Sequence, residues 1–331
     1  MSQARKYNLA VVGANGMVGA EMLKILAERK FPIREIRAYG SGRGEKWAKF
    51  GEGQLEVQPL EESSFKDLNL VLMSAGEEVS RQWAMAGALV IDNSSAWRME
   101  VGCPLVVPEV NGNMIASHKG VVANPNCCTI ALSLALAPIQ RRAGLKRVVV
   151  ATYQSASGAG RPLVEELEEQ TKAIIEGRET MAKVYPKQLA FNVVSGGWNE
   201  AEGGQNEEEV KIARETRKIL GLPSLNMAVT CVRVPVKVGH GEAVFVETER
   251  AISVEEAKAA LGAMEGVKVV EGEAPTPLDV AGSDDVLVGR VRQDSSVEHG
   301  LAMWVVSDNL RKGAALNAVQ IAEWAAKRSL L

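Results

Sequence analysis

Two adjacent cysteines, Cys127 and Cys128, lie where a loop meets a predicted helix. Residues 124–129 read Asn-Pro-Asn-Cys-Cys-Thr, directly before the apolar, helix-forming run Ile130–Ile139. A thiol at a helix N-terminus meets backbone N–H groups and the positive end of the helix dipole, and both favour the nucleophilic thiolate. Free cysteines are also often small, buried hydrophobes. From position alone, two interpretations therefore stay open: this cysteine pair provides a nucleophile, or both cysteines are buried core residues.

A glycine-spaced loop follows the first predicted strand, Leu9–Val12. Residues 13–19 read Gly-Ala-Asn-Gly-Met-Val-Gly and lead into the predicted helix Met17–Glu28. Glycine lets the backbone turn tightly and approach a pyrophosphate, whose charge is stabilised at a helix N-terminus. The alternative is a tight turn with helix-packing glycines and no ligand, but the strand-turn-helix context favours a dinucleotide. The residues expected to hold it are Gly13, Ala14, Asn15, Gly16, Met17 and Val18.

The end of the second predicted strand indicates which dinucleotide binds. This strand, Glu35–Tyr39, is followed by Ser41, Gly42 and Arg43, without an acidic residue at its tip. An Asp or Glu there would bind the ribose 2′-hydroxyl of NAD, whereas a hydroxyl with an arginine suits the 2′-phosphate of NADP. We therefore predict a preference for NADP.

Composition excludes several classes of partner. Hydrophobic residues make up 46% of the 331 residues, charged residues 24%, and the formal net charge is −3 without a Lys/Arg block, which argues against nucleic acid or an anionic membrane. No apolar run reaches transmembrane length. Four cysteines, two of them adjacent, do not form a disulfide framework, so we expect a reducing, cytoplasmic setting. We expect no metal, because His118, His240 and His299 are scattered and no C-x-x-C pair occurs.

The secondary-structure elements that must position these residues follow two different patterns along the chain. Before residue 150, short apolar strands alternate with helical stretches, which predicts βαβ units and a mostly parallel sheet. After about Leu145, longer strand-like runs appear between amphipathic segments, which predicts an α+β domain on a largely antiparallel sheet. The expected strands are 9–12, 69–73, 88–92, 120–123, 147–154, 227–238 and 243–248, and the expected helices include 17–28, 80–86 and 309–328.

Taken together, these motifs resemble bacterial aspartate-β-semialdehyde dehydrogenases nearly from end to end. The blocks that carry the resemblance are Gly13–Gly19, Asp92–Arg98, Asn124–Thr129, Thr152–Gly160, Glu208–Lys211, Arg233–Ala243 and Ser307–Ala315. The resemblance implies a Rossmann-like NADP-binding domain (1–127 with helix 310–331) and an α+β catalytic and dimerisation domain (128–309). It also implies a homodimer or homotetramer.

The activity implied by this resemblance is the NADP-dependent reductive dephosphorylation of L-aspartyl 4-phosphate to L-aspartate 4-semialdehyde. This step belongs to lysine, threonine, methionine and diaminopimelate biosynthesis. It needs a thiolate that adds to a carbonyl and a base that takes and returns the thiol proton. The resemblance assigns Cys127 as nucleophile and His240 as base, and it leaves Cys128 as a small helix-start residue. Without it, His240, between two glycines, is equally well a loop residue. Asn126 is expected to donate toward the thiohemiacetal oxygen.

The doubly charged substrate requires charged side chains. The resemblance assigns the α-carboxylate to Arg233, whose planar fork suits bidentate binding. By spacing alone, Glu208 and Lys211 are a solvated helix face and Arg98 is a surface arginine. The remaining roles that the resemblance implies are the α-amino group for Glu208, the phosphate for Arg98 and Lys211, the acyl group for Gln154, and the nicotinamide for Ser157, Gly158 and Asn309.

Two segments depart from the family pattern, and three other functions fit the sequence less well. Residues 194–200 read Val-Ser-Gly-Gly-Trp-Asn-Glu where a proline and a hydrophobic-acid pair are usual, which puts local packing and a subunit contact in doubt. The 41–44 loop lacks one hydroxyl of the family's Ser-x-Arg-Ser. N-acetylglutamyl-phosphate reductases typically carry Pro-Gly-Cys instead of Pro125-Asn126-Cys127, and the blocks around the cysteine of glyceraldehyde-phosphate dehydrogenase do not fit. A non-catalytic NADP-binding regulator is disfavoured because the nucleophile and its partners are all present.

Overall fold

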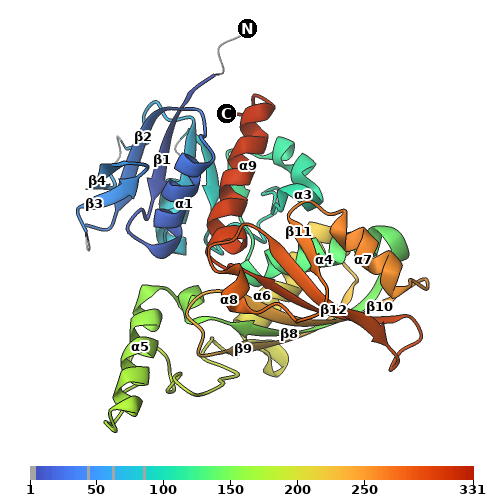
Figure 1. Ribbon diagram of the computed structural model, residues 1–331. Coiled ribbons are helices and arrows are strands. Elements are labelled where there is room, and N and C mark those ends of the chain that lie inside the picture. Colours follow the sequence, from blue (N-terminus) through green and yellow to red (C-terminus); the bar gives the residue numbers. More distant parts are fainter. Residues whose placement is uncertain (1–4, 43–44, 62–63, 85–86) are drawn as a thin grey trace. The chain divides into compact units, whose positions relative to one another are not determined.

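The computed structural model describes residues 5–42, 45–61, 64–84 and 87–331, and these form two compact units. The first unit comprises Met1–Asn126 and Ala314–Leu331, and the second comprises Cys127–Gly313. Figure 1 follows the chain from blue to red, so the blue and red elements of the first unit are sequence-distant parts of one body.

The first unit is built on a sheet whose described strands run in the order β3-β4-β2-β1-β5-β6-β7. Neighbouring strands are parallel, except that β3 pairs antiparallel with β4. From β4 to β7 this is the order of a doubly wound dinucleotide-binding sheet, which binds its ligand at the carboxyl ends of the strands. The strands are β1 (Tyr7–Val12), β2 (Ile33–Gly40), β3 (Trp47–Phe50), β4 (Gly53–Pro59), β5 (Leu70–Met73), β6 (Leu89–Asp92) and β7 (Val121–Ala123).

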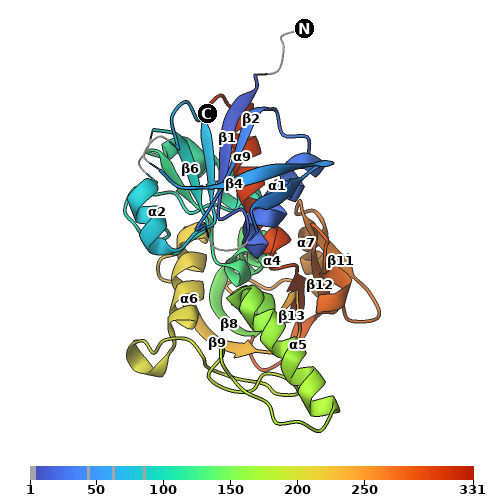
Figure 2. The same ribbon diagram turned by 90° about the vertical axis from the view of Figure 1, so that its left-hand side faces the viewer.

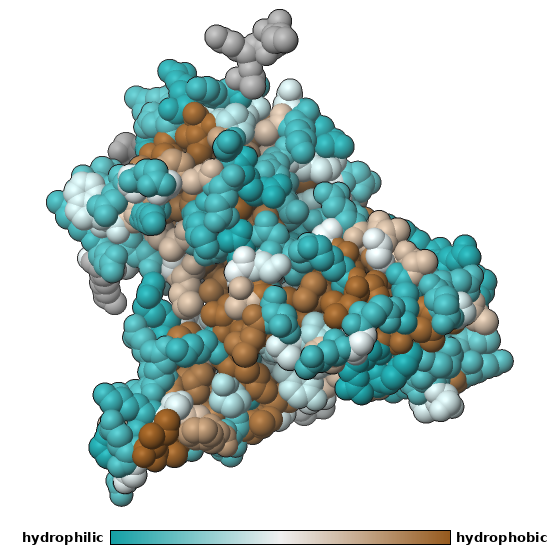
Figure 3. All heavy atoms as spheres, in the orientation of Figure 1, coloured by the Kyte–Doolittle hydropathy of each residue, from teal (hydrophilic) through white to brown (hydrophobic). Residues whose placement is uncertain are grey.

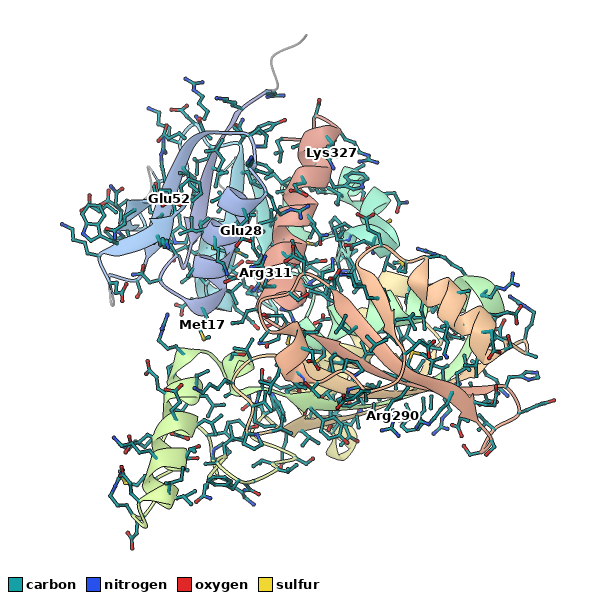
Figure 4. All side chains as sticks on the ribbon, in the orientation of Figure 1. Met17, Glu28, Glu52, Arg290, Arg311 and Lys327 are labelled. Carbon is teal, nitrogen blue, oxygen red and sulfur yellow. The ribbon has the colours of Figure 1, made fainter. Side chains whose placement is uncertain are left out.

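Helices α1 (Met17–Glu28) and α9 (Leu316–Lys327) pack together in the first unit, although they come from opposite ends of the chain (Figures 1 and 2). The two ends of α1 are marked by the labelled residues Met17 and Glu28 in Figure 4. Its apolar side is fully buried and joins α9 and the strands in one hydrophobic core. The other helices of this unit are α2 (Glu77–Trp83), α3 (Pro108–Asn111) and the 3-10 helix η1 (Gly112–Ser117).

The second unit holds a sheet with the described strand order β11-β12-β13-β10-β8-β9. The three central pairings are antiparallel, and the outermost pairings β11–β12 and β8–β9 are parallel. The strands are β8 (Leu145–Gln154), β9 (Asn226–Arg233), β10 (His240–Thr248), β11 (Val267–Val270), β12 (Val286–Asp294) and β13 (Gly300–Ser307).

Helices cover one face of this second sheet, because α4, α6 and α7 all contact its strands. The opposite face keeps large apolar side chains at the surface: Tyr153 is 38% exposed and Phe245 37% exposed, while their chain neighbours Thr152 and Val244 are fully buried. Figure 3 shows hydrophobic surface gathered over the strands of this unit. The helices of the unit are α4 (Cys127–Ala143), η2 (Ala156–Ala159), α5 (Arg161–Ile175), η3 (Glu202–Gly204), α6 (Glu207–Leu220), α7 (Val254–Gly262) and α8 (Pro277–Val280). The π-helical turn Arg311–Ala315 begins in this unit and ends in the first.

These elements confirm the predicted fold class and correct several details. The run predicted as one strand, 227–238, ends at Arg233, and β3, β4, β11, β12 and β13 were not predicted. The helix predicted at 80–86 is Glu77–Trp83, and residues 85–86 lie outside the described residues. Among the described helices, none combines the length and the apolarity that crossing a membrane requires.

Candidate active site

The glycine loop, Gly13–Gly19, joins β1 to α1 at the carboxyl end of the strand. Gly13 has φ +79°, and a Cβ there would lie 2.1 Å from the backbone oxygen of Ser74. A Cβ on Gly19 would lie 2.1 Å from the backbone oxygen of Gly13. Only glycine fits at these two positions, so the start of α1 packs directly against the turn. The loop leaves a helix N-terminus where an anion is stabilised.

The other residues predicted to bind the cofactor are partly described. Ala14 is buried and its N–H donates to the Tyr39 carbonyl of β2 at 3.0 Å. Asn15 donates from Nδ2 to the Glu45 carbonyl at 2.6 Å, while its Oδ1 has no hydrogen-bond partner. Ser41 is exposed, as is Gly42 beside it, and Arg43 lies outside the described residues. The NADP preference therefore stays a prediction.

Arg98 is held inside the first unit by a tight turn. It is 9% exposed and donates from Nη2 to the Asn93 carbonyl at 3.0 Å. The fully buried Asp92 organises this turn by accepting hydrogen bonds from Ser80 Oγ (2.5 Å) and from the N–H of Ser94 (3.0 Å). Burial raises the pKa of Asp92 above its usual range. The surface-arginine alternative is wrong for Arg98, because this side chain is buried.

Sheet register gathers the other predicted residues at one edge of the second sheet. Gln154, the last residue of β8, pairs with Arg233, the last residue of the parallel strand β9. His240 is the first residue of β10, which runs antiparallel to β8, so it begins where β8 ends. We call Gln154, Arg233 and His240, together with Cys127 and Glu208, the strand-end cluster. Because His240 begins a strand, the loop alternative for it is wrong.

Cys127 is half-buried and begins α4. The Cys127 and Cys128 sulfurs and one ring nitrogen of His240 all lie within 4.8 Å of one another. The thiol of Cys128, which donates to Cys127, is the largest cause that lowers the pKa of Cys127 well below its ordinary value, and the charges of His240 and Arg233 act in the same direction. The same three side chains are within reach of a single metal ion, so the absence of a metal stays a prediction.

Gln154 and Glu208 form a buried polar pair. Gln154 donates from Nε2 to Glu208 Oε1 at 3.1 Å and accepts from Thr152 Oγ1 at 3.1 Å. Glu208 lies in the first turn of α6 and is 8% exposed, so the solvated-face alternative is wrong for this residue. A carboxylate held by an amide in a buried position is suited to a positively charged group of a ligand.

The guanidinium of Arg233 is buried between aromatic rings. Its carbon Cζ lies 4.9 Å from the ring centre of Trp198 and 5.6 Å from that of Tyr185. Nη1 donates to the Ser155 carbonyl at 2.7 Å, while Nε has no hydrogen-bond partner. Trp198 comes from the segment that departs from the family pattern. That segment therefore packs on a residue of the strand-end cluster.

His240 is 1% exposed and its Nδ1 faces Ser155, whose N–H and hydroxyl both lie 3.0 Å away. Nε2 has no hydrogen-bond partner from nitrogen or oxygen. Ser157 and Asn309 lie behind Ser155: Asn309 donates from Nδ2 to Ser157 Oγ at 2.9 Å, and its Oδ1 accepts from Ser155 Oγ at 3.1 Å. The structure thus brings Ser157 and Asn309 together, as expected of two residues with a shared role.

Gly158 leaves the space beside His240 open. A Cβ there would lie 3.2 Å from Cε1 and Nε2 of the His240 ring and 3.0 Å from Nη1 of Arg233. Any side chain at residue 158 would push against both groups.

Glu242 is a buried acid that sequence reasoning missed. It lies two residues after His240 on β10 and therefore on the same face, is 1% exposed, and neither of its oxygens accepts a hydrogen bond from nitrogen or oxygen. Burial, together with the charge of Cys127, raises the pKa of Glu242 well above its usual range, although a hydrogen bond with the Cys128 thiol opposes the shift. The signal available in the sequence was the two-residue spacing from His240.

Lys211 and Asn126 are two further predicted site residues outside the strand-end cluster as defined above. Lys211 lies on α6, partly exposed, with Nζ 3.5 Å from Glu207 Oε1. Asn126 is buried at the end of the first unit, directly before Cys127 in the chain. Lys211 and Arg98 belong to different units, so their joint role in phosphate binding stays a prediction.

Comparisons with known proteins place the whole chain. Residues 8–118 match the family described as semialdehyde dehydrogenase, NAD binding domain, and residues 136–312 match semialdehyde dehydrogenase, dimerisation domain. An aspartate-semialdehyde dehydrogenase of Aquifex aeolicus is 48% identical, over 98% of this chain and 99% of its own length. The chain belongs to the aspartate-semialdehyde dehydrogenase family.

Two further relatives of the family agree. An aspartate-semialdehyde dehydrogenase of Prochlorococcus marinus is 46% identical, over 98% of this chain and 97% of its own length. The crystal structure of aspartate semialdehyde dehydrogenase II from Vibrio cholerae, complexed with ASA, superposes with a TM-score of 0.95 at 42% identity, over 98% of this chain and 99% of that chain. The family identity confirms the resemblance inferred from the motifs.

Proposed function

We propose that this family member catalyses the NADP-dependent reductive dephosphorylation of L-aspartyl 4-phosphate to L-aspartate 4-semialdehyde through a Cys127 thioester. The observation that carries the proposal is the strand-end cluster: a thiol with a lowered pKa beside an imidazole, within one unit that also buries a guanidinium and a paired carboxylate. Each of these groups matches one part of the substrate.

Each step of the proposed reaction is assigned to particular residues. The Cys127 thiolate attacks the acyl carbon, and inorganic phosphate leaves to give the thioester. His240 supplies a proton to the carbonyl-derived oxygen as the thioester is reduced and takes it back as the carbon–sulfur bond breaks. Gln154 orients the acyl group, and Asn126 donates toward the developing oxyanion. Arg98 and Lys211 bind the phosphate.

NADP fits the glycine loop of the first unit. The absence of a Cβ at Gly13 and Gly19 allows the turn and the helix N-terminus to come together, which is the arrangement that holds a pyrophosphate. When bound, the cofactor supplies the hydride that reduces the acyl carbon. Ser157 and Asn309 contact the nicotinamide, and Ser41 with Arg43 select the 2′-phosphate. Equal or better turnover with NAD under matched conditions would contradict the selection.

Glu208 favours an amino acid with a free amino group over its N-acetylated counterpart. Its carboxylate is buried and already accepts from Gln154, so a charged ammonium is the ligand that compensates it best. An N-acetyl group carries no charge and so offers no ion pair to that carboxylate.

The deciding assay uses purified protein, NADP, phosphate and aspartate semialdehyde. We expect a phosphate-dependent rise in absorbance from NADPH, which Cys127→Ser abolishes and Cys128→Ser retains. No phosphate-dependent rise in the wild-type protein would contradict the proposed function. Activity that survives Cys127→Ser but not Cys128→Ser would assign the other thiol as nucleophile.

The second unit is also the proposed interface of a homodimer or homotetramer. Its sheet face keeps Tyr153 and Phe245 partly exposed, which is the kind of surface that a second copy covers. Sedimentation of the wild-type protein and of Phe245→Glu checks this: we expect the substitution to weaken association, and a monomeric wild type would contradict it.

A further inference from the structure

Tyr185 lies beside Arg233 but is not among the residues to which the proposed reaction assigns a role. It is 5% exposed, and its ring centre lies 5.6 Å from Cζ of Arg233. The ring centre of Trp198 lies 4.9 Å from the same atom. The two rings meet edge to face, with their centres 6.4 Å apart and an interplanar angle of 88°. They therefore form a right-angled corner against the guanidinium. The resemblance to the family assigned no role to Tyr185.

Tyr185 also holds the segment that carries the second ring of this corner. Its hydroxyl donates to the carbonyl of Gly196. The next residue, Gly197, has φ +86°, and a Cβ there would overlap the Tyr185 ring, so only glycine fits. Earlier in the segment, the N–H of Val194 donates to the Arg233 carbonyl at 3.0 Å, and the N–H of Arg233 donates to the Val194 carbonyl at 2.8 Å. The segment is thus attached to Arg233 at one end and to Tyr185 at the other.

Helix α5 fixes the position of Tyr185 itself. The carboxylate of Glu166, a buried residue of α5, accepts from three consecutive backbone N–H groups, those of Lys183 (2.7 Å), Val184 (2.6 Å) and Tyr185 (3.4 Å). Gln170, one turn later on the helix, donates from Nε2 to Glu166 Oε1 at 3.2 Å. Hydrogen bonds to an ionised acceptor are stronger than those between neutral groups. Tyr185 is therefore held by a helix, although it lies outside regular structure.

The contacts of Arg233 leave one edge of its guanidinium for a ligand. Nη1 donates to the Ser155 carbonyl at 2.7 Å, while Nε is buried without a hydrogen-bond partner among the described residues. Because the guanidinium is planar, the fork of Nε and Nη2 lies on the edge away from Nη1 and can receive both oxygens of a carboxylate. A buried N–H without an acceptor costs free energy, which a bound carboxylate would remove.

We propose that Tyr185 is a positioning residue that acts through Arg233: its ring fixes the plane of the guanidinium, so that the edge of Nε and Nη2 is presented to the α-carboxylate of the substrate. A side chain that is already held loses less freedom when its ligand binds, which strengthens binding. The steps at the acyl carbon do not depend on this ring. The inference rests on the proposed function, in which Arg233 binds that carboxylate.

Two substrates that differ only in the carboxylate separate this role from a general structural one. In Tyr185→Leu we expect KM for aspartate semialdehyde to rise about tenfold with kcat within about twofold, the size of effect that a desolvated cation–π contact supports. The compound 3-aminopropanal keeps the aldehyde and the amino group but lacks the carboxylate. Its kcat/KM should be equal in the wild type and Tyr185→Leu. An equal loss of kcat/KM with both substrates would overturn the proposal, because a general loss of structure predicts that result.

Two further variants serve as controls. Tyr185→Phe keeps the ring and should recover most of the wild-type KM. Tyr7→Leu removes another buried tyrosine, which is 3% exposed at the start of β1 in the first unit, and should leave KM and kcat unchanged. A matching rise of KM in Tyr7→Leu would overturn the proposal, because the loss of any buried ring would then have the same effect.

Modification of Arg233 by phenylglyoxal tests the inference in the full chain without any substrate. Mass spectrometry of the peptide that contains Arg233 gives the rate. Arg233 is 3% exposed, so the wild type and Tyr7→Leu should react slowly, and Tyr185→Leu should react about tenfold faster because the guanidinium is released. An unchanged rate in Tyr185→Leu would overturn the inference. Faster modification with an unchanged KM for aspartate semialdehyde would mean that Tyr185 does hold Arg233, and that the assignment of the α-carboxylate to Arg233 is wrong.

Discussion

The glycine loop of the first unit and the strand-end cluster of the second unit are assembled in opposite ways. The loop is seven consecutive residues, and its geometry follows from two positions that exclude a Cβ. The cluster draws residues from positions 127 to 240 and depends on the register of β8, β9 and β10. A site made from a local turn can be predicted from the sequence, whereas a site made from strand ends can be predicted only once the pairing of the strands is known.

The largest expected effect separates the two adjacent cysteines of the cluster. Cys127→Ser should lower kcat at least about a thousandfold, because a serine hydroxyl is a far weaker nucleophile than a thiolate. Cys128→Ser, the matched control, should keep kcat within about tenfold because its hydroxyl can still donate to the Cys127 sulfur. Steady-state rates of the two variants measure this. Similar losses in both would mean that the pair acts as a unit.

A substitution in the glycine loop should act through a steric clash rather than through the loss of a reacting group. Gly19→Ala places a Cβ against the backbone oxygen of Gly13, so it should cost about 2–3 kcal/mol of stability and weaken NADP binding. The control is Gly53→Ala at the start of β4, where the nearest atom would lie at an ordinary 3.8 Å. Thermal unfolding and NADP titration of both variants test the contrast. An equally stable Gly19→Ala protein would show that the loop relaxes freely.

Substitution of Trp198, whose ring contacts Arg233, tests how far the strand-end cluster depends on a segment that is distant from its strands in the sequence. Trp198→Ala should raise KM for aspartate semialdehyde about tenfold with little change in kcat, because a desolvated cation–π contact contributes about 1–2 kcal/mol. Trp198→Phe keeps an aromatic face, so its KM should lie between those of the wild type and Trp198→Ala. Initial-rate kinetics over a range of substrate concentration decide the matter, and an unchanged KM in the alanine variant would remove Trp198 from the binding of the substrate.

The smallest expected effect concerns the pH at which Cys127 reacts. Because its pKa is lowered, the thiolate is present, and alkylation by iodoacetamide proceeds, at a pH below the ordinary thiol range near about 8.5. Cys128→Ala removes the donor thiol, so the pKa of Cys127 should rise and the alkylation midpoint should move to higher pH.

The alkylation is read as a mass increase of one adduct against pH. Cys103, Cys128 and Cys231 are buried, so the half-buried Cys127 should react first. Cys128→Ser should keep the wild-type midpoint. A midpoint that does not move in Cys128→Ala would mean that the helix terminus and His240 lower the pKa of Cys127 without help from the neighbouring thiol.

The sequence predicts regular elements well where the chain itself fixes them. Helix α1 has the predicted bounds Met17–Glu28, because its apolar side already begins at Val18, within the glycine loop. By contrast, β3 and β4 are largely exposed, so they lack the apolar run that marks a strand. The run after Met227 reads as one strand, but it ends at Arg233: Pro235 and Gly239, with φ +93°, follow there.

The strand-end cluster could be predicted only residue by residue from the family resemblance. Spacing alone left Glu208 and Arg98 as solvated residues, and their burial is decided by tertiary packing. The contacts of Ser155 and Trp198 lie beyond any local pattern, because each depends on which strand is the neighbour of β8 and where a distant loop returns. Glu242 is partly predictable: strand periodicity places it on the same face as His240, but it cannot show that the carboxyl group is buried.

The missing side chain at residue 158 also limits how this protein can change over generations. Gly158 stands where a single added carbon would press on both Arg233 and His240. A substitution at this residue would therefore disturb two groups of the strand-end cluster in one step, so we expect glycine to be kept here wherever both groups keep their positions.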